Sequence, residues 1–389
     1  MPNDTDNLPL SGLRVLDFAQ FLAGPVAAMR LADLGAEVIK IERPGVGDLC
    51  RSMIVNDQTL EGESLVFHTF NRGKKSVAAD LKNERDLENV KELVATADVL
   101  IHNFRPGVME RIGLGFEAVQ AINPKLVYGA VSGYGTEGPW AKKPGQDLLV
   151  QSLSGIAWLN GNACDGPVPT GFAMLDVATA GNLVQGILAC LLRRGRTGQG
   201  GLVEVDLLTS AVDLTFEQFT CFLNDNNRQP QRHEIGNANP YQPAPYGIYK
   251  TADGFLAFAM TPLQKVADLL GKPEIAAFGQ ENAFTELNAI KKIVSKEFLS
   301  KPTQHWLDIL EPEGIWCAPV LNWVDFVETE GFKAANLVQT LTTAEGEQAL
   351  TTKCPIRIDG ASPISTEVGP KLGQDTEAVF SKAAALTEV

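Results

Sequence analysis

The sequence predicts an α/β protein with an open, mostly parallel sheet and a second, smaller α+β domain. Short β-rich runs alternate with amphipathic segments between Leu13 and Ser132, which is the pattern of repeated β-α-β units. A polar stretch rich in asparagine and proline, residues 224–245, then separates this pattern from a different one. A chain of 389 residues, 44% of them hydrophobic, is long enough for two domains.

The predicted strands of the first part follow one another with helices between them. In chain order they are Leu13–Ala19, Ala36–Glu42, Ser76–Leu81, Asp98–Phe104 and Lys125–Ser132. A helix begins after Gly24 and Pro25, and a charged helix covers about Glu84 to Thr96. Because parallel strands present their carboxyl ends at one edge of the sheet, we expect the ligands there.

The change in composition sets the expected domain boundaries. Residues 1–223 form the first part of the large domain, and 224–321 form the small domain with its linker. Residues 322–389 form a C-terminal segment with short strands and a closing helix from Thr376.

Composition and charge exclude several classes of function. The formal net charge is -14, which disfavours nucleic acid and anionic membrane surfaces as partners. The six cysteines are far apart, without C-x-x-C and without the spacing of a metal site. We find neither a signal peptide nor about 18 uninterrupted apolar residues. We therefore expect a cytoplasmic protein that binds no metal, nucleic acid or membrane.

A glycine string at Gly133, Gly135 and Gly138 has the spacing of a dinucleotide-binding motif. It follows a predicted strand, but Pro139 and the lysine-rich loop after it do not open a helix. A nucleotide-dependent dehydrogenase is therefore disfavoured. P-loop, H-E-x-x-H and G-x-S-x-G motifs do not occur, which disfavours P-loop NTPases, zincin proteases and nucleophile-elbow hydrolases.

Basic residues gather near the ends of the predicted strands. They are Lys40, Arg43, Arg72, Lys74, Lys75, Arg105 and Arg111. In an acidic protein, such a group at the ligand edge is suited to the phosphates of a nucleotide-type ligand, because arginine pairs with phosphate oxygens. A solvated charged surface is the alternative, and the residues alone leave both open.

Asp176 precedes a long apolar helical segment, within Thr170–Leu192. A carboxylate there commonly caps the helix or interacts with its dipole. It could instead be a nucleophile held among small residues. Composition alone favours the cap.

Several blocks of the sequence occur in a characteristic order. They are LSGLRVLDFAQFLAGPVAAMRLADLGAEVIKIERPGVGD, FNRGKKSVAADLK, ADVLIHNFRPGVMERIGLGFEAV, GQDLLVQSLSG, the Asp176 segment and GRTGQGGLVEVDLL. They closely resemble the class III CoA-transferase family, the group of formyl-CoA transferase, carnitine CoA-transferase and 2-methylacyl-CoA racemase. The resemblance implies a Rossmann-like CoA-binding domain built from both ends of the chain, to which 322–389 return, and a homodimer of interlinked rings.

The resemblance matches Asp176 to the family's catalytic aspartate. It implies that this carboxylate attacks an acyl-CoA and forms an aspartyl-CoA thioester, which an acceptor acid then resolves. Matches to CoA-contacting positions are Gln20, Phe21, Leu22, Ala23, Arg43, Asn103, Phe104 and Arg111, the first three by position only, with Lys74 and Lys75 expected near the phosphates. Acyl-CoA is then a substrate, and we expect no tightly bound cofactor.

One departure distinguishes branches of the family. Racemases have histidine in a G-H-D string, where this chain has Gly145, Gln146 and Asp147. Because an amide cannot act as a general base, we favour a CoA-transferase that moves CoA to a small carboxylic acid. A 2-methylacyl-CoA racemase and a non-catalytic CoA-binding protein are the alternatives.

The segment from His233 to Pro245 corresponds to the mobile glycine-rich loop of formyl-CoA transferase. It contains Gly236 and Asn237 but is not a glycine run. It remains a candidate lid over the substrate, and its composition puts oxalate and formate in doubt as substrates. Asp375 stands where many relatives have histidine.

Overall fold

The computed structural model describes residues 8–387. It divides into two compact units. The first contains the chain up to Val150, Ala173–Ala211 and the chain from Leu337 onward, and the second contains Gln151–Phe172 and Val212–Asn336. Each unit is described below by itself.

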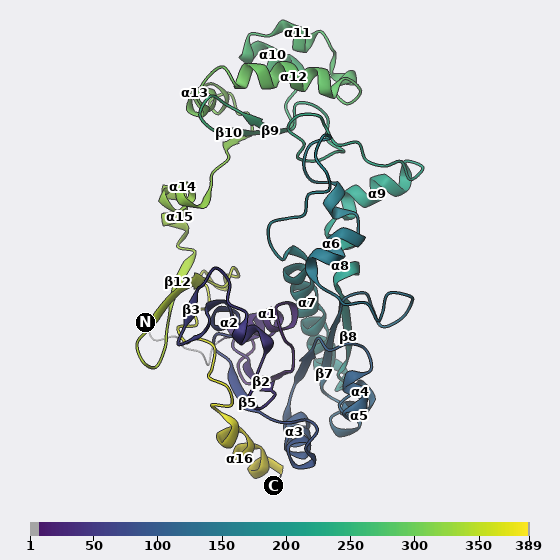
Figure 1. Ribbon diagram of the computed structural model, residues 1–389, viewed down its shortest axis with the longest axis vertical. Coiled ribbons are helices and arrows are strands. Elements are labelled where there is room, and N and C mark those ends of the chain that lie inside the picture. Colours follow the sequence, from purple (N-terminus) through teal and green to yellow (C-terminus); the bar gives the residue numbers. More distant parts are fainter. Residues whose placement is uncertain (1–7, 388–389) are drawn as a thin grey trace. The chain divides into compact units, whose positions relative to one another are not determined.

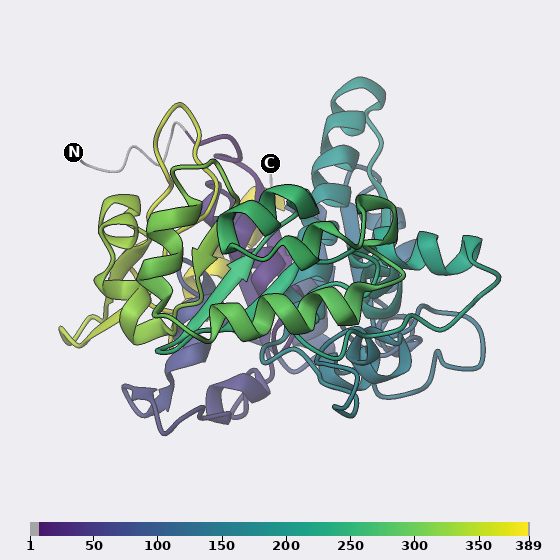
Figure 2. The ribbon, with the colours of Figure 1, turned by 90° about the horizontal axis from the view of Figure 1, so that it is seen from above.

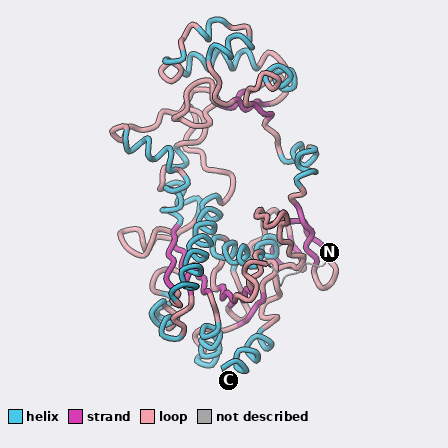
Figure 3. Tube along the Cα trace, turned by 180° about the vertical axis from the view of Figure 1, so that it is seen from behind, coloured by secondary structure: helices cyan, strands magenta, loops and turns pink. Residues whose placement is uncertain are grey.

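A six-stranded parallel sheet forms the centre of the first unit (Figures 1 and 3). In spatial order its strands are β5 (Lys75–Ala78), β2 (Glu37–Glu42), β1 (Arg14–Asp17), β6 (Val99–His102), β7 (Val127–Ser132) and β8 (Gly201–Asp206). All neighbouring strands pair in parallel. The open parallel sheet predicted from the sequence is confirmed.

Helices cover both faces of this sheet (Figure 1). The helices α1 (Ala23–Asp33) and α7 (Met174–Thr197) cover one face, and α3 (Glu84–Thr96), α5 (Phe116–Ile122) and α16 (Thr376–Thr387) cover the other. Successive strand residues alternate between the two cores: Val15 packs with α1, whereas Leu16 packs with α3. Burial on both faces explains why these strands read as continuous apolar runs.

The helix α7 is, by length and composition, apolar enough to cross a membrane. In the structure it packs instead against α1, β7 and β8. Leu183 and Ile187 belong to the core on this face. Gly186 allows a close approach, since a β-carbon there would lie 2.5 Å from a methyl group of Val203. The apolar character of α7 is thus accounted for by packing on the sheet.

The end of the chain returns to the first unit, and α16 packs on α3. Asp375 joins it to β5: its backbone N–H donates to the Ser76 carbonyl (2.9 Å), and its Oδ2 accepts from the Ser76 N–H (2.9 Å). The remaining elements that lie in this unit or begin in it are η2 (Leu49–Ser52), β3 (Thr59–Leu60), β4 (Glu63–Ser64), α2 (Leu65–Phe70), α4 (Val108–Arg111), α6 (Asp147–Leu153), α8 (Leu207–Leu214), β12 (Val338–Thr342) and β13 (Gln348–Thr352).

The second unit contains a three-stranded antiparallel sheet with its own core. Its strands are β9 (Gly247–Lys250), β10 (Phe255–Phe258) and β11 (Cys317–Pro319). Its helices are η3 (Ile156–Trp158), α9 (Phe216–Asn224), α10 (Leu263–Leu270), α11 (Pro273–Ala276), η4 (Gln280–Asn282), α12 (Leu287–Phe298), α13 (Thr303–Leu310), α14 (Trp323–Glu328) and α15 (Glu330–Ala335). The green helix α12 packs against β9 (Figure 2).

The unit boundaries differ from those expected. Residues 151–172 and 212–223 belong to the second unit, as do 322–336. For residues 159–166 the reason is a set of hydrogen bonds distant in sequence: Arg232 donates to the carbonyls of residues 160, 165 and 166, and Asn237 donates to those of 159 and 161. These contacts leave no signal in local composition.

Candidate active site

A cavity of about 250 Å³ lies at the carboxyl edge of the sheet in the first unit. It is lined by residues at or after the carboxyl ends of four different strands and by residues of the short helix α4 (Val108–Arg111) and its end. They are Phe18, Gln20, Ile41, Glu42, Arg43, Ala79, Asp80, Leu81, Lys82, Phe104, Val108 and Ile112. Three residues expected to contact CoA are thereby brought together: Gln20, Arg43 and Phe104. This is the edge at which open parallel sheets bind ligands.

The loop between β1 and α1 is held in place by side chains from other strands. The Asn103 carboxamide accepts from the Gln20 N–H (2.8 Å) and donates to the Gln20 carbonyl (2.6 Å). The next residue, Phe21, has a φ of 64°, and its N–H donates to Asp48 Oδ1 (3.1 Å). Phe21 is 46% exposed, whereas Ala23 is buried. Asn103 therefore holds the backbone of this loop in place through two hydrogen bonds to Gln20.

Buried charges lie beneath this loop. The Lys40 ammonium donates to the Ala19 carbonyl (2.7 Å) and pairs with Asp48 (2.8 Å). The Lys74 ammonium pairs with Asp17 (2.8 Å). Burial alone would raise the pKa of Asp17, but Lys40 and Lys74 hold it below its usual range. These four side chains are almost wholly buried, so each charge is stabilised inside the protein by its oppositely charged neighbours.

The expected basic pair is not brought to the cavity. The Lys74 ammonium also donates to Asn71 and to the Pro25 carbonyl, so its three donors are used inside the protein. Lys75 begins β5 and pairs with Glu37 (2.6 Å), at the amino end of the sheet. The cavity contains Lys82 instead, which follows the carboxyl end of the same strand.

Two of the expected arginines have no competing partner in the described part of the chain. Arg43 follows β2, is exposed, and forms no ion pair among residues 8–387. Arg111 ends the short helix α4 and is likewise exposed and without an ion pair there. Arg43 lines the cavity, whereas Arg111 is not among its lining residues. An uncompensated guanidinium group is available to an anionic ligand.

Asp176 lies in the first turn of α7 and is not its cap. Oδ2 of Asp147 accepts from the backbone N–H groups of Leu175 (2.7 Å) and of Asp176 (3.1 Å). Asp147 thus satisfies two of the free donors at the start of α7. The Asp176 carboxylate has no hydrogen bond within the described residues, and its residue is partly buried. Burial, and then the charge of Asp147, raise the pKa of Asp176 to about 6.

Gln146 immediately precedes this capping aspartate and is exposed. Gly145 approaches Gly133 so closely that a β-carbon on either would lie 2.5 Å from the other's Cα. Gly133 therefore allows two chain segments to meet, and no helix follows its glycine string. Gly133 is thus accounted for by the packing of two chain segments. The helix that follows the glycines of a dinucleotide-binding motif does not occur here.

Gly236 and Asn237 lie in the second unit. The Asn237 side chain accepts from the His233 N–H (3.2 Å) and donates to the carbonyls of Leu159 (3.0 Å) and Gly161 (2.8 Å). The Asn237 side chain thus holds the segment 233–237 against residues 159–161.

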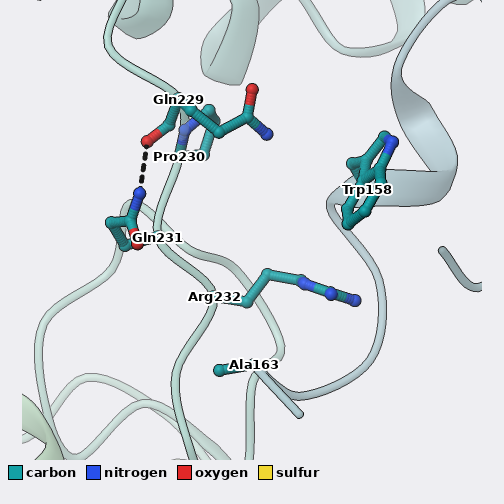
Figure 4. Close-up of a pocket in the computed structure, with 6 residues that line it drawn as sticks. All are labelled: Trp158, Ala163, Gln229, Pro230, Gln231 and Arg232. Carbon is teal, nitrogen blue, oxygen red and sulfur yellow. Dashed lines mark hydrogen bonds between the residues drawn. The ribbon is translucent and has the colours of Figure 1, made fainter. Parts of the chain in front are cut away.

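The second unit has a further cavity of about 440 Å³, lined by Trp158 and residues 229–232 (Figure 4). Arg232 lies over the Trp158 ring at 5.4 Å, and its donors are taken by backbone carbonyls. The arginine therefore organises a loop. Among the described residues, no group of three or more His, Cys, Asp or Glu side chains could hold a metal ion.

The first unit thus defines an α/β protein of the open-sheet class, with a cationic ligand edge and a carboxylate of raised pKa at the start of a core helix. A model of CoA-transferase family III matches residues 10–376. The chain belongs to this family and is a CoA-transferase.

Similar proteins cover most of the chain. The succinyl-CoA:glutarate CoA-transferase of Mus musculus is 36% identical over 82% of this chain and 73% of its own length. The acetyl-CoA:oxalate CoA-transferase of Acetobacter aceti is 33% identical, over 97% of this chain and 96% of its own. A solved CaiB/BaiF family structure from Brucella suis covers 97% of this chain and 100% of its own, at 31% identity and a TM-score of 0.81.

The buried charges give the first prediction, in which two adjacent lysines serve as test and control. Replacing Lys74 with methionine removes one side of a buried ion pair, so Lys74→Met should lower the free energy of unfolding by about 3–5 kcal/mol. Lys75→Met removes an exposed pair and should cost less than about 1 kcal/mol. Urea unfolding followed by circular dichroism measures both. Equal losses would contradict the account of the buried charges.

Proposed function

We propose that this enzyme moves CoA from an acyl-CoA to a free acid through an aspartyl-CoA thioester on Asp176. The observation that supports the proposal is that the Asp176 carboxylate is not used in capping its helix. Its helix is capped by Asp147 instead, and its own carboxylate has no hydrogen-bond partner in the described chain. An unoccupied, partly desolvated carboxylate is suited to nucleophilic attack.

The reaction sequence requires no net proton transfer. The Asp176 carboxylate attacks the thioester carbonyl, CoA thiolate leaves, and a mixed anhydride forms. The thiolate then attacks the aspartyl carbonyl, releasing the donor acid and leaving the aspartyl-CoA thioester. The acceptor carboxylate attacks this thioester, and the released thiolate attacks the acceptor's acyl carbon. The new acyl-CoA forms and Asp176 is regenerated, so the energy of the thioester is kept from water.

We propose the cavity at the carboxyl edge as part of the CoA site. Arg43 and Lys82 line it from two strand ends, Arg111 is exposed and free of ion pairs within the described chain, and Phe104 offers an aromatic face. The Gln20–Phe21 loop borders the same edge. Phosphates are suited to the cations, and a base to the ring.

The acceptor is proposed to be a small dicarboxylic acid. The support is the named activities of two relatives, which transfer CoA to glutarate and to oxalate. The second relative keeps oxalate a candidate, although the composition of the segment 233–245 disfavours it. A panel of glutarate, succinate, oxalate and formate, with succinyl-CoA or acetyl-CoA as donor, distinguishes these acids when the new thioesters are identified by mass spectrometry. If monocarboxylates alone were accepted, the proposed class would be wrong.

We also propose that the enzyme acts in the cytoplasm as an interlinked homodimer. Large apolar side chains are left exposed on two helices of the second unit: Phe216 on α9 is 69% exposed and Trp323 on α14 is 86% exposed. All six cysteines are free, in keeping with a reducing compartment. Sedimentation equilibrium tests the dimer, which a stable, fully active monomer would exclude.

The proposed nucleophile gives the second prediction. Asp176→Asn and Asp176→Ala should each reduce acyl transfer at least about 10³-fold, because neither can displace CoA. Both variants should still bind CoA, since the cavity at the strand ends is unchanged. As the carboxylate is partly buried and caps nothing, the asparagine variant should be no less stable than the wild type. If Asp176 were a cap, alanine would cost about 1 kcal/mol of stability and spare the chemistry.

The neighbouring carboxylate gives the third prediction. Asp176 must be ionised to attack, so kcat/KM should fall as the pH drops through about 6. Asp147→Asn keeps an oxygen for the start of α7 but removes the charge, and should shift this acid limb to lower pH. The pH profile of wild type and variant measures the shift. A limb at the same pH in both would mean that Asp147 has no electrostatic effect.

The cationic edge gives the fourth prediction. Arg43→Glu should raise the KM for acyl-CoA by about tenfold or more, since charge-assisted hydrogen bonds to phosphate are lost. The KM for the acid should be unchanged. Arg85→Glu makes the same charge change on an exposed part of α3 and is the control. Similar effects of the two substitutions would remove Arg43 from the CoA site.

A further inference from the structure

One lysine of α12 closes the segment 233–246 in the second unit. The Lys291 side chain is wholly buried, and its Nζ lies 2.9 Å from the Gly236 carbonyl oxygen and 2.6 Å from that of Tyr246. The same nitrogen is 2.8 Å from Nδ1 of His233, which is also buried. A single amine therefore bonds to both ends of the segment.

The backbone at this closure is tightly packed. A β-carbon at Gly247 would collide with the Gly236 carbonyl oxygen and lie 2.9 Å from Nζ of Lys291. Gly236 itself has a φ of 61°, a conformation that side chains disfavour. The two glycines thus allow the chain ends to meet around the amine.

The amine has no counter-charge. Among the described residues, Lys291 forms no ion pair, and the titratable groups that face it are His233 from the segment and Tyr249 from β9, whose ring centre is 5.8 Å away. The nearby acid Glu234 pairs with Lys292 (2.9 Å) at the surface. A neutral amine would donate to the two carbonyls and accept from the imidazole, leaving no buried charge.

We propose that Lys291 and His233 form an acid-sensitive clasp, which holds the segment 233–246 closed while both side chains are neutral and loosens it when either gains a proton. This device is separate from the chemistry at Asp176. It does not depend on the proposed mechanism.

The direction of the pH effect follows from burial. Burial lowers the pKa of Lys291 to about 7, and burial followed by the charge of Lys291 lowers that of His233 to about 4. An opened segment exposes both groups, which then bind protons as ordinary lysine and histidine do. The open state therefore binds more protons, and the closed state loses stability as the pH falls. For Lys291 this loss extends down to about pH 7, and for His233 it extends further, to about pH 4.

Hydrogen–deuterium exchange of peptides from 233–246, normalised to the rate of an unprotected chain, tests the clasp. In wild type the protection should fall by about tenfold per pH unit between pH 9 and 7. Lys291→Met cannot take up a proton and should remove this dependence. Lys291→Arg is permanently charged and should keep the segment open at every pH.

Lys296→Met is the matched control, because Lys296 is an exposed lysine of the same helix α12 and forms no ion pair among the described residues. It should behave as wild type does. An ammonium that must be charged to hold the segment would give the opposite result: arginine would preserve closure and methionine would abolish it. Protection of the wild-type segment that is equal at pH 7 and 9 would also overturn the proposal.

A measurement on the unmodified protein covers the case in which a variant does not fold. With lysines labelled with ¹³C at the ε-carbon, one lysine signal of the wild-type enzyme should titrate near pH 7. If all lysine signals titrated in the ordinary alkaline range, the neutral clasp would be excluded.

Discussion

The geometry of the ligand edge depends on charges buried beneath it. Lys40 ties the end of the first strand to Asp48, and Lys74 ties Asp17 to the start of the first helix. Removing any one would leave a neighbouring charge buried without its partner, a costly state inside a protein. The cluster fixes the loop 19–22 that borders the cavity, so buried charged side chains set the shape of the proposed CoA-binding surface.

Much of the edge could be predicted from the order of strands and helices. Arg43 follows a strand, and topology alone places it where ligands bind. Lys74 precedes β5 and Lys75 begins it, so the same rule places both lysines in the interior or at the opposite edge of the sheet, away from the position that their charge and the family resemblance predict. The same rule points to Lys82, which follows that strand and lines the cavity.

Contacts between residues distant in sequence could not be predicted. The bond from Asp147 to the start of α7 joins residues 29 positions apart, so the sequence alone left Asp176 ambiguous between cap and nucleophile. The unit boundaries depend in the same way on hydrogen bonds that join residues 159–166 to Arg232 and Asn237. Local composition shows that such segments are polar, but it does not predict the residues with which they form hydrogen bonds.

The central claim is that CoA becomes covalently attached to Asp176, and chemical reduction of the intermediate tests it most directly. Wild-type enzyme incubated with acyl-CoA alone and then treated with borohydride should lose activity, because an aspartyl thioester is reduced to an alcohol. Tandem mass spectrometry of the digested protein should then find homoserine at position 176, and only when acyl-CoA was present. An unmodified aspartate at that position in enzyme inactivated by this treatment, or reduction at another residue, would contradict the account.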